Sequence, residues 1–253
     1  MRPIGFSTGA IAYADFNRAL DLLRGEAVTC VELSALRFPE AHLLLSSIRE
    51  LDLTRYSYVS FHAPSSFDPV QEKVLVNDLR EHLPAHWPII LHPDTIHDQG
   101  LWRQFRSQLA IENMDQRKLG GRTVEELTDV FAGLPEASFC FDIGHARQCD
   151  TSMTGAYKML KAFSERLIQV HVSEVNSSSQ HDPVSYAAQI SFREVSGLIP
   201  SRIPLIVESR VSPDGLGREI RRVLESLPEQ PLLVLVPGRK YVSHTLDMER
   251  NSP

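Results

Sequence analysis

Six apolar runs of this sequence end in a histidine or a carboxylate, and these six residues could do chemistry together. They follow one another at intervals of 20 to 37 residues. Imidazole and carboxylate groups bind divalent metal ions and transfer protons in acid–base catalysis. A fold that gathers the six would therefore form a metal centre. The six residues are His62, His92, Glu112, Asp142, His171 and Glu208.

Three carboxylates and three imidazoles at one place predict a divalent cation rather than a hydrogen-bonded core. Crowded carboxylates repel one another, so without a cation at least one of them would have to be protonated. Mixed nitrogen and oxygen ligands suit Zn²⁺, Mn²⁺, Co²⁺ or Fe²⁺, and the set is too rich in nitrogen for Ca²⁺. One polar residue at a strand end often only caps a loop, but six in succession favour a metal.

Strand-like and helix-like segments alternate along the chain and must position these residues. Short apolar runs predict strands, and segments with a period of about 3.6 residues predict helices. Eight of each, at roughly 30 residues per unit, predict an α/β fold with parallel strands, a single (β/α)8 TIM barrel. The expected strands span residues 4–7, 28–32, 58–62, 88–92, 108–112, 138–142, 167–171 and 204–208. The expected helices lie around residues 15–25, 39–50, 69–83, 100–107, 123–133, 154–166, 184–198 and 215–227.

Such a barrel would gather all six residues, because the carboxyl ends of its strands form one mouth, where the active sites of this fold lie. A doubly wound open sheet is the alternative, but the turn at residues 7–10 lacks the G-x-G-x-x-G pattern that such sheets often use for phosphate. We predict a barrel over residues 1–228 and a short, partly flexible C-terminal extension over 229–253. An apolar run at 232–236 could pack across the barrel floor or pair with a second chain in a homo-oligomer.

Composition and charge limit the partners. The chain has 253 residues, 42% of them hydrophobic and 23% charged, which is ordinary for a globular protein. Its net charge of −6 argues against nucleic acid or a membrane surface and favours a small-molecule substrate. No apolar run approaches the roughly 20 residues of a membrane span. Three cysteines without paired spacing predict a reduced, cytoplasmic setting.

Three further residues are candidates for the same site. His145 stands three residues after Asp142, which would place it at the mouth. His181 lies in a polar loop, where a histidine is more often solvated than a ligand. Arg210 lies two residues past Glu208 and, in an extended continuation of the strand, would point toward the mouth. Its guanidinium could bind a phosphate or carboxylate of a small substrate.

Other charged residues near the strand ends have two interpretations. Glu32 ends the second apolar run and could support a ligand or contact substrate. Arg117, Lys118 and Arg147 follow the fifth and sixth runs and could bind an anion, or they could be ordinary surface charges.

Taken in order, the residues around the strand ends resemble the signature segments of the xylose-isomerase-like barrel superfamily. The resemblance covers about residues 4–210. This superfamily includes sugar and sugar-phosphate isomerases and epimerases, and the endonuclease IV type of abasic-site nucleases. The segments are Phe61-His62-Ala63-Pro64, Leu91-His92-Pro93, Ile111-Glu112-Asn113, Phe141-Asp142-Ile143-Gly144-His145-Ala146, Val170-His171-Val172-Ser173 and Val207-Glu208-Ser209.

Resemblance to the isomerases and epimerases implies one metal, held by Glu112, Asp142, His171 and Glu208. In ketose 3-epimerases, residues matching Glu112 and Glu208 also move the substrate proton, one on each face of the carbon. The metal polarises the carbonyl and makes that proton acidic. Ketose 3-epimerases usually carry an arginine where this sequence has Ser177, which weakens this reading.

Resemblance to the endonuclease IV type implies a different centre, with three zinc ions. An aspartate that precedes the loop histidine by two residues is Ser179 here, which argues against a third ion. The acidic charge and short loops also argue against DNA. The other zinc ligands of that type match His62, His92, Glu112, Asp142, His145, His171, His181 and Glu208.

The sequence favours a metal-dependent isomerase or epimerase acting on a small sugar, polyol or sugar derivative, with Glu112 and Glu208 as catalytic residues. The alternative is a hydrolase of phosphoesters with two or three metals. A third class is a barrel that binds metal but has lost its chemistry. We expect one tight metal site, with a weak second ion at His62 and His92 and no stable third.

Overall fold

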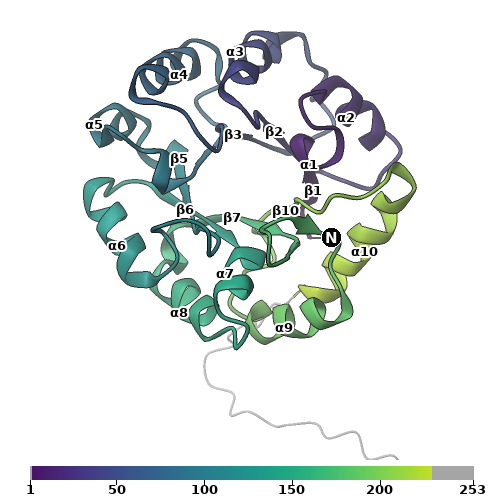
Figure 1. The fold of residues 1–253 in the computed structure, drawn as a ribbon. Coiled ribbons are helices and arrows are strands. Elements are labelled where there is room, and N and C mark those ends of the chain that lie inside the picture. The colour runs from purple at the N-terminus through teal and green to yellow at the C-terminus, as the bar shows by residue number, and fades with distance from the viewer. Residues whose placement is uncertain (1, 230–253) are drawn as a thin grey trace, which may run out of the picture.

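The centre of the protein is a closed barrel of eight parallel strands, described by a computed structural model over residues 2–229 (Figure 1). Neighbouring strands follow sequence order from β1 to β7, and β10 closes the ring between β7 and β1. The strands are β1 (Ile4–Ser7), β2 (Cys30–Ser34), β3 (Tyr58–His62), β4 (Ile89–Leu91), β5 (Leu109–Glu112), β6 (Ser138–Asp142), β7 (Leu167–Val172) and β10 (Leu205–Val207). The predicted (β/α)8 barrel is confirmed.

A ring of helices surrounds the barrel, as connections between parallel strands require (Figure 1). Two of them begin at clear sequence signals. Pro69 occupies the first turn of α4 after the capping residue Asp68, and Thr123 accepts a hydrogen bond from the N–H of Glu126 in α6. The helices are α1 (Thr8–Ala12), α2 (Phe16–Leu23), α3 (Phe38–Ser47), α4 (Pro69–His82), α5 (Gln99–Trp102), α6 (Val124–Gly133), α7 (Ile143–Cys149), α8 (Thr154–Ala162), α9 (Tyr186–Ser196) and α10 (Leu216–Ser226).

Strand residues alternate between the barrel interior and the layer beneath the helices. Outward residues such as Ile111 belong to the large apolar core between barrel and helices. Inward residues form a small separate cluster that contains Ala110 and Cys140. Because side chains repeat with a period of two along a strand, the next inward residues after these two are Glu112 and Asp142. The packed interior therefore supports the polar residues at the mouth.

Several strand boundaries differ from the prediction. The second strand begins and ends two residues later than expected, so Glu32 lies within β2 and points into the barrel. The fourth and the last barrel strands end one residue earlier, which places His92 and Glu208 directly after β4 and β10. The other predicted strands are found within one residue of their expected ends.

Two elements that carry site histidines were not predicted, and neither was helix α1, from which Gly9 and Ala10 line a pocket at the mouth. Helix α7 starts immediately after β6, and Asp142 accepts a hydrogen bond from the N–H of His145 as its N-cap. The polar loop after β7 contains a short antiparallel pair, β8 (Glu174–Val175) and β9 (His181–Asp182). These elements carry His145 and His181, so they decide whether the two histidines reach the site.

The predicted C-terminal extension lies outside the described residues except for its first position, and the division at residue 228 stays a prediction. Among residues 2–229, no helix combines the length and the apolar character needed to cross a membrane.

Candidate metal centre

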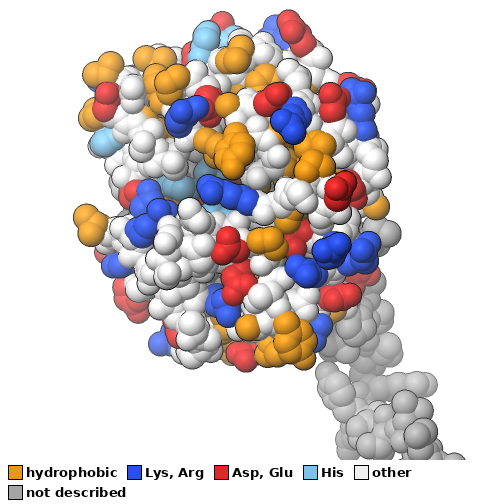
Figure 2. Space-filling model, turned by 45° about the vertical axis from the view of Figure 1, so that its right-hand side comes forward, with side chains coloured by type: hydrophobic (Ala, Val, Ile, Leu, Met, Phe, Trp, Pro, Cys, Tyr) orange, Lys and Arg blue, Asp and Glu red, His pale blue; other side chains and the backbone are white. Residues whose placement is uncertain are grey.

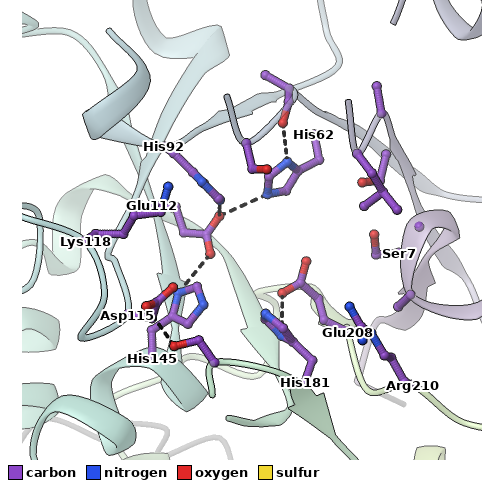
Figure 3. A pocket seen from close by; sticks show the side chains of 18 of the residues that line it. Ser7, His62, His92, Glu112, Asp115, Lys118, His145, His181, Glu208 and Arg210 are labelled. Atoms are coloured by element: carbon purple, nitrogen blue, oxygen red, sulfur yellow. Dashed lines mark hydrogen bonds and ion pairs between the residues drawn. The ribbon is translucent and has the colours of Figure 1, made fainter. Parts of the chain in front are cut away.

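The six strand-end residues lie together at the carboxyl mouth of the barrel, at a pocket of about 440 Å³. Figure 3 shows four of them, His62, His92, Glu112 and Glu208. Parallel register places Asp142 beside His171, each near the end of its strand. These two are fully buried at the bottom of the site. The other four line the pocket. Figure 2 shows histidine side chains in a hollow of the surface, with lysine or arginine side chains beside it.

Glu112 is the centre of this arrangement, with 1% of its surface exposed. Its Oε2 lies 3.1 Å from Nε2 of His62 and 3.4 Å from Nε2 of His92. Its Oε1 lies 3.4 Å from Nδ1 of His171 and 3.3 Å from Nδ1 of His145. The two oxygens of one carboxylate therefore face two different sets of histidines.

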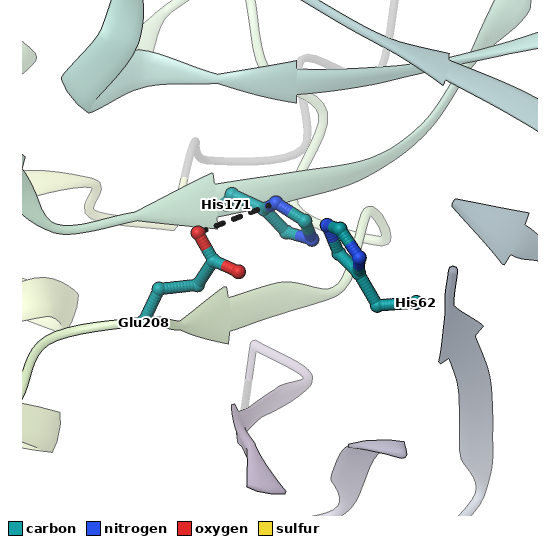
Figure 4. A group of neighbouring side chains, drawn as sticks. All are labelled: His62, His171 and Glu208. Atoms are coloured by element: carbon teal, nitrogen blue, oxygen red, sulfur yellow. Dashed lines mark ion pairs between the residues drawn. The ribbon is translucent and has the colours of Figure 1, made fainter. Parts of the chain in front are cut away.

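This geometry produces three groups of residues, and within each group the possible ligand atoms lie within 4.8 Å of one another. We call them the outer group (His62, His92, Glu112), the central group (Glu112, Asp142, His171, Glu208) and the loop group (Asp142, His145, His181). Glu112 belongs to the first two and Asp142 to the last two. A further combination joins His62, His171 and Glu208 across the mouth (Figure 4).

Buried atoms without partners test whether these residues fit a metal. Nδ1 of His171 and Oδ2 of Asp142 are buried and make no hydrogen bond, although such buried orphans are rare in folded proteins. Both atoms belong to residues of the central group. Nδ1 of His171 lies 3.6 Å from Oε2 of Glu208 (Figure 4). Imidazole nitrogens and carboxylate oxygens at these positions fit a divalent ion of the Zn²⁺ type.

The electrostatics of the site favour bound positive charge. Burial raises the pKa of Glu208 to about 7 and lowers the pKa of His181 to about 3. Burial opposes the charged form of His62 and His145 too, but Glu112 and Asp142 outweigh it and raise their pKa values to about 9 and about 10. The buried carboxylates thus require positive charge, which protons on the imidazoles or metal ions can supply.

The loop group has ligand atoms in place and, like the outer group, shares its carboxylate with the central group. Nδ1 of His145 lies 2.9 Å from the backbone oxygen of Asn113, so Nδ1 donates there and Nε2 is the nitrogen that would bind a metal. The rings of His145 and His181 lie 5.4 Å apart. The Ser179 hydroxyl lies 2.9 Å from Oδ1 of Asp115 and does not replace a carboxylate ligand. Besides Asp142, oxygens of Glu112 and Glu208 lie 3.3 and 3.4 Å from the Nδ1 atoms of His145 and His181.

Arg210 lines the pocket and is exposed at its rim (Figure 3). Its backbone N–H donates to the backbone oxygen of His181, which fixes its position beside the mouth. The other candidate cations near the mouth already have partners. Lys118 lies 2.7 Å from Asp94, Arg117 bonds Asp115, and Arg147 bonds Glu174.

Sequence reasoning missed two residues that shape the site. Asn113 exchanges two hydrogen bonds of 2.8 Å with the backbone of Asp142 and so ties β5 to the start of α7. Asp115 is 3% exposed and lines the pocket next to the loop group. Its place three residues after Glu112 could have suggested this location. Its bond to Ser179, 64 residues away in sequence, could not have been predicted.

The sequence matches no protein-family model and no curated protein. The structure is similar to endonuclease IV from Thermus thermophilus, with a TM-score of 0.59, 18% identity and coverage of 90% of this chain and 99% of that one. It is similar to SacUVDE at a TM-score of 0.56 and 12% identity, covering 91% and 100%. It is also similar to a protein from Anabaena variabilis assigned as a sugar phosphate isomerase/epimerase, with a TM-score of 0.51 and 14% identity, over 97% of this chain and 93% of that one. The resemblance to xylose-isomerase-like barrels is thus confirmed for the fold.

Proposed function

We propose that this protein is a metal-dependent phosphoester hydrolase with at least two divalent ions at the mouth of the barrel. The observation that carries the proposal is the position of Glu112, whose two oxygens face the outer and the central group separately. A carboxylate can bridge two ions through its two oxygens, whereas a neutral imidazole has only one lone pair. The geometry thus favours the hydrolase, which the sequence had placed second.

A centre with one metal in the central group would leave the outer histidines without an ion to bind. His62 and His92 aim their Nε2 atoms at the same oxygen of Glu112, and their side chains are only 10% and 11% exposed. The Nδ1 atom of His62 lies 2.7 Å from the backbone oxygen of Ala63. It donates there, and Nε2, which faces Oε2 of Glu112, is the nitrogen that would bind a metal after losing its proton.

Two adjacent divalent ions supply a nucleophile from water at neutral pH and stabilise the charge of a phosphoryl group in transfer. The residues of this chain would hold and orient the reacting groups. Glu112 would join the two ions, and Asp142, His171 and Glu208 would complete the central one. Arg210, which makes no ion pair within the described residues, would bind a non-bridging phosphate oxygen of the substrate.

The shape and charge of the site favour a small phosphoester over a DNA duplex. A pocket of about 440 Å³ is in the range of small-molecule sites. Ser7, Gly9, Ala10 and Ser34 form a wall of small uncharged residues and leave room for a substrate. The net charge of −6 gives no attraction for a polyanion.

An isomerase or epimerase is the second candidate, and one observation favours it. Glu112 and Glu208 belong to the same central group beside His171. The pKa of Glu208, raised by burial to about 7, lies near the operating pH, where a carboxylate acts best as acid and base. In that case His62 and His92 would bind hydroxyl groups of the substrate.

The two candidates differ in metal count and in substrate. We expect the purified protein to contain at least two zinc ions per chain and to hydrolyse bis(p-nitrophenyl) phosphate. A chelator should abolish this activity and added zinc should restore it. One ion per chain, no hydrolysis of phosphoesters and turnover in a panel of ketoses would support the isomerase instead. A duplex containing an abasic site tests the DNA substrate separately.

A further inference from the structure

A carboxylate is buried inside the barrel directly beneath the candidate metal centre. Glu32 on β2 has no exposed surface. Its Oε2 lies 2.6 Å from Nε2 of Gln169, 3.1 Å from the hydroxyl of Ser60 and 3.1 Å from Nε2 of His171. Interiors of such barrels are usually filled by branched apolar side chains, and burial of a charged carboxylate opposes folding. The position of Glu32 therefore requires an explanation in terms of its partners.

His171 connects this carboxylate to the metal centre through its two ring nitrogens. Nε2 faces down toward Glu32, and Nδ1 faces up toward Glu112 and Glu208 at 3.4 and 3.6 Å. A neutral imidazole carries a proton on one nitrogen and a lone pair on the other, and only the lone pair can bind a metal. The metal centre therefore needs the proton of His171 on Nε2.

Gln169 offers a competing hydrogen bond. Its Oε1 accepts a hydrogen bond of 2.8 Å from the hydroxyl of Tyr58, so its amide nitrogen is the end that faces His171. That nitrogen lies 2.8 Å from Nε2 of His171. If the amide donated to Nε2, the ring proton would move to Nδ1 and block the metal. A carboxylate at position 32 prevents this, because it accepts from both Gln169 and His171.

We propose that Glu32 is a positioning residue that holds His171 in its Nε2–H form and turns the lone pair of Nδ1 toward Glu112 and Glu208. This inference rests on the metal centre of the proposed function. Carboxylates that accept the second N–H of a metal-binding histidine fix its orientation and raise its basicity, and their loss typically costs about 10- to 100-fold in metal affinity.

Glu32→Gln tests the role of the charge, because the amide has nearly the same shape but can donate to Nε2. We expect the affinity of the metal-stripped protein for Zn²⁺, measured by competition with a chromophoric chelator, to fall about 10- to 100-fold. Ser60→Ala is the matched control: it removes another hydrogen bond to Glu32 and leaves His171 untouched, so zinc affinity should stay at the wild-type value.

A second measurement needs no variant at Glu32. Long-range ¹H–¹⁵N spectra of the zinc-loaded wild type should place the ring proton of His171 on Nε2. A proton on Nδ1 would overturn the inference, as would a folded Glu32→Gln protein with unchanged zinc affinity, and in the latter case the proposed hydrolase would stand. A wild type that binds no zinc would overturn both.

Discussion

Two pairs of histidines flank the shared carboxylates of the site, and they are held in different ways. His62 is the last residue of β3 and His92 follows β4 directly, so the barrel itself sets their positions. His145 lies in α7 and His181 in the hairpin of β8 and β9, which are added above the barrel. The strand-borne pair forms a group with Glu112 and the loop-borne pair forms one with Asp142, and the central group shares both carboxylates.

This difference indicates which ions the protein holds tightly. Strand ends vary little in position because their backbone is fixed by pairing on both sides, and Glu112 gives the outer group a buried carboxylate. In the loop group, His181 depends on a hairpin whose strands have two residues each, and the neighbouring Ser179 hydroxyl bonds Asp115 instead of offering a charged ligand. We therefore expect tight ions in the outer and central groups and a weak one in the loop group.

The largest effect is expected for Glu112→Gln, because this residue serves both tight groups. An amide is neutral and cannot bridge two ions with two charged oxygens. Zinc content should fall from at least two ions per chain to nearly none. The affinity for zinc should fall by more than roughly 100-fold, the upper cost of losing a group that only hydrogen-bonds to a metal ligand. Elemental analysis after dialysis measures this. Glu174→Gln, which changes a carboxylate bound to Arg147, should keep its zinc. Two ions retained in Glu112→Gln would refute the bridge.

Removing each histidine pair in turn tests the comparison itself. His62→Ala with His92→Ala should lose one tight ion, whereas His145→Ala with His181→Ala should leave the tight ions in place. Calorimetric titration of the stripped variants with Zn²⁺ counts the sites. Equal losses from both pairs would contradict the distinction between strand-borne and loop-borne histidines. The control is His42→Ala, which removes an exposed histidine paired with Asp78 and should leave the number of zinc sites unchanged.

Ser179→Asp should strengthen metal binding at the loop group. Residue 179 has a φ of 53°, a region that aspartate tolerates better than most residues. A carboxylate there would lie beside Asp115, so the variant should be less stable without metal and should bind a further zinc ion more tightly than the wild type does. Ser178→Asp, which adds the same charge at an exposed neighbouring position, should not. A Ser179→Asp protein with no additional zinc would show that the loop group cannot be completed from this position.

The smallest effect concerns Asp115 and the stability of the loop-borne side. Burial alone would raise the pKa of Asp115, but hydrogen bonds from Arg117 and Ser179 outweigh it and bring the pKa to about 2. Because folding lowers the pKa of Asp115, its charged form stabilises the folded protein at pH values above the ordinary pKa near 4. This stabilisation is lost as the pH falls toward about 2. Asp115→Asn should therefore lower the free energy of unfolding by about 1 to 2 kcal/mol at neutral pH, and less near pH 3.

Urea unfolding of the chelator-treated protein at the two pH values measures this difference. A loss of stability at pH 3 equal to that at neutral pH would assign the effect of Asp115→Asn to shape rather than charge.

The sequence alone predicted the barrel and the strand-borne side of the site, because both follow from a regular pattern. Apolar runs that end in His62, Glu112 and Asp142 report the strand ends directly, and parallel topology then brings them together. Glu32 was assigned to the end of a strand because the apolar run is interrupted there. In the structure the strand continues through Leu33 and Ser34, so Glu32 lies inside it. Its contact with His171 depends on barrel closure, which joins positions 139 residues apart.

The loop-borne side could not be predicted in the same way. Helix α7 is only seven residues long and begins at Asp142, which acts as its N-cap as well as a candidate ligand. Strands β8 and β9 have two residues each, too few to produce a pattern. The position of His181 is set by hydrogen bonds such as the one between its Nδ1 and the hydroxyl of Ser173, at 2.9 Å. Such contacts arise from tertiary structure and leave no periodic signal.

The central claim is that Glu112 joins two metal ions, and anomalous diffraction at the zinc absorption edge tests it most directly. Crystals of the zinc-loaded protein should give two strong peaks, one bound by His62, His92 and an oxygen of Glu112, the other by the second oxygen with Asp142, His171 and Glu208. A single strong peak in the central group, with His62 and His92 hydrogen-bonded to solvent or substrate, would contradict the account and favour the isomerase.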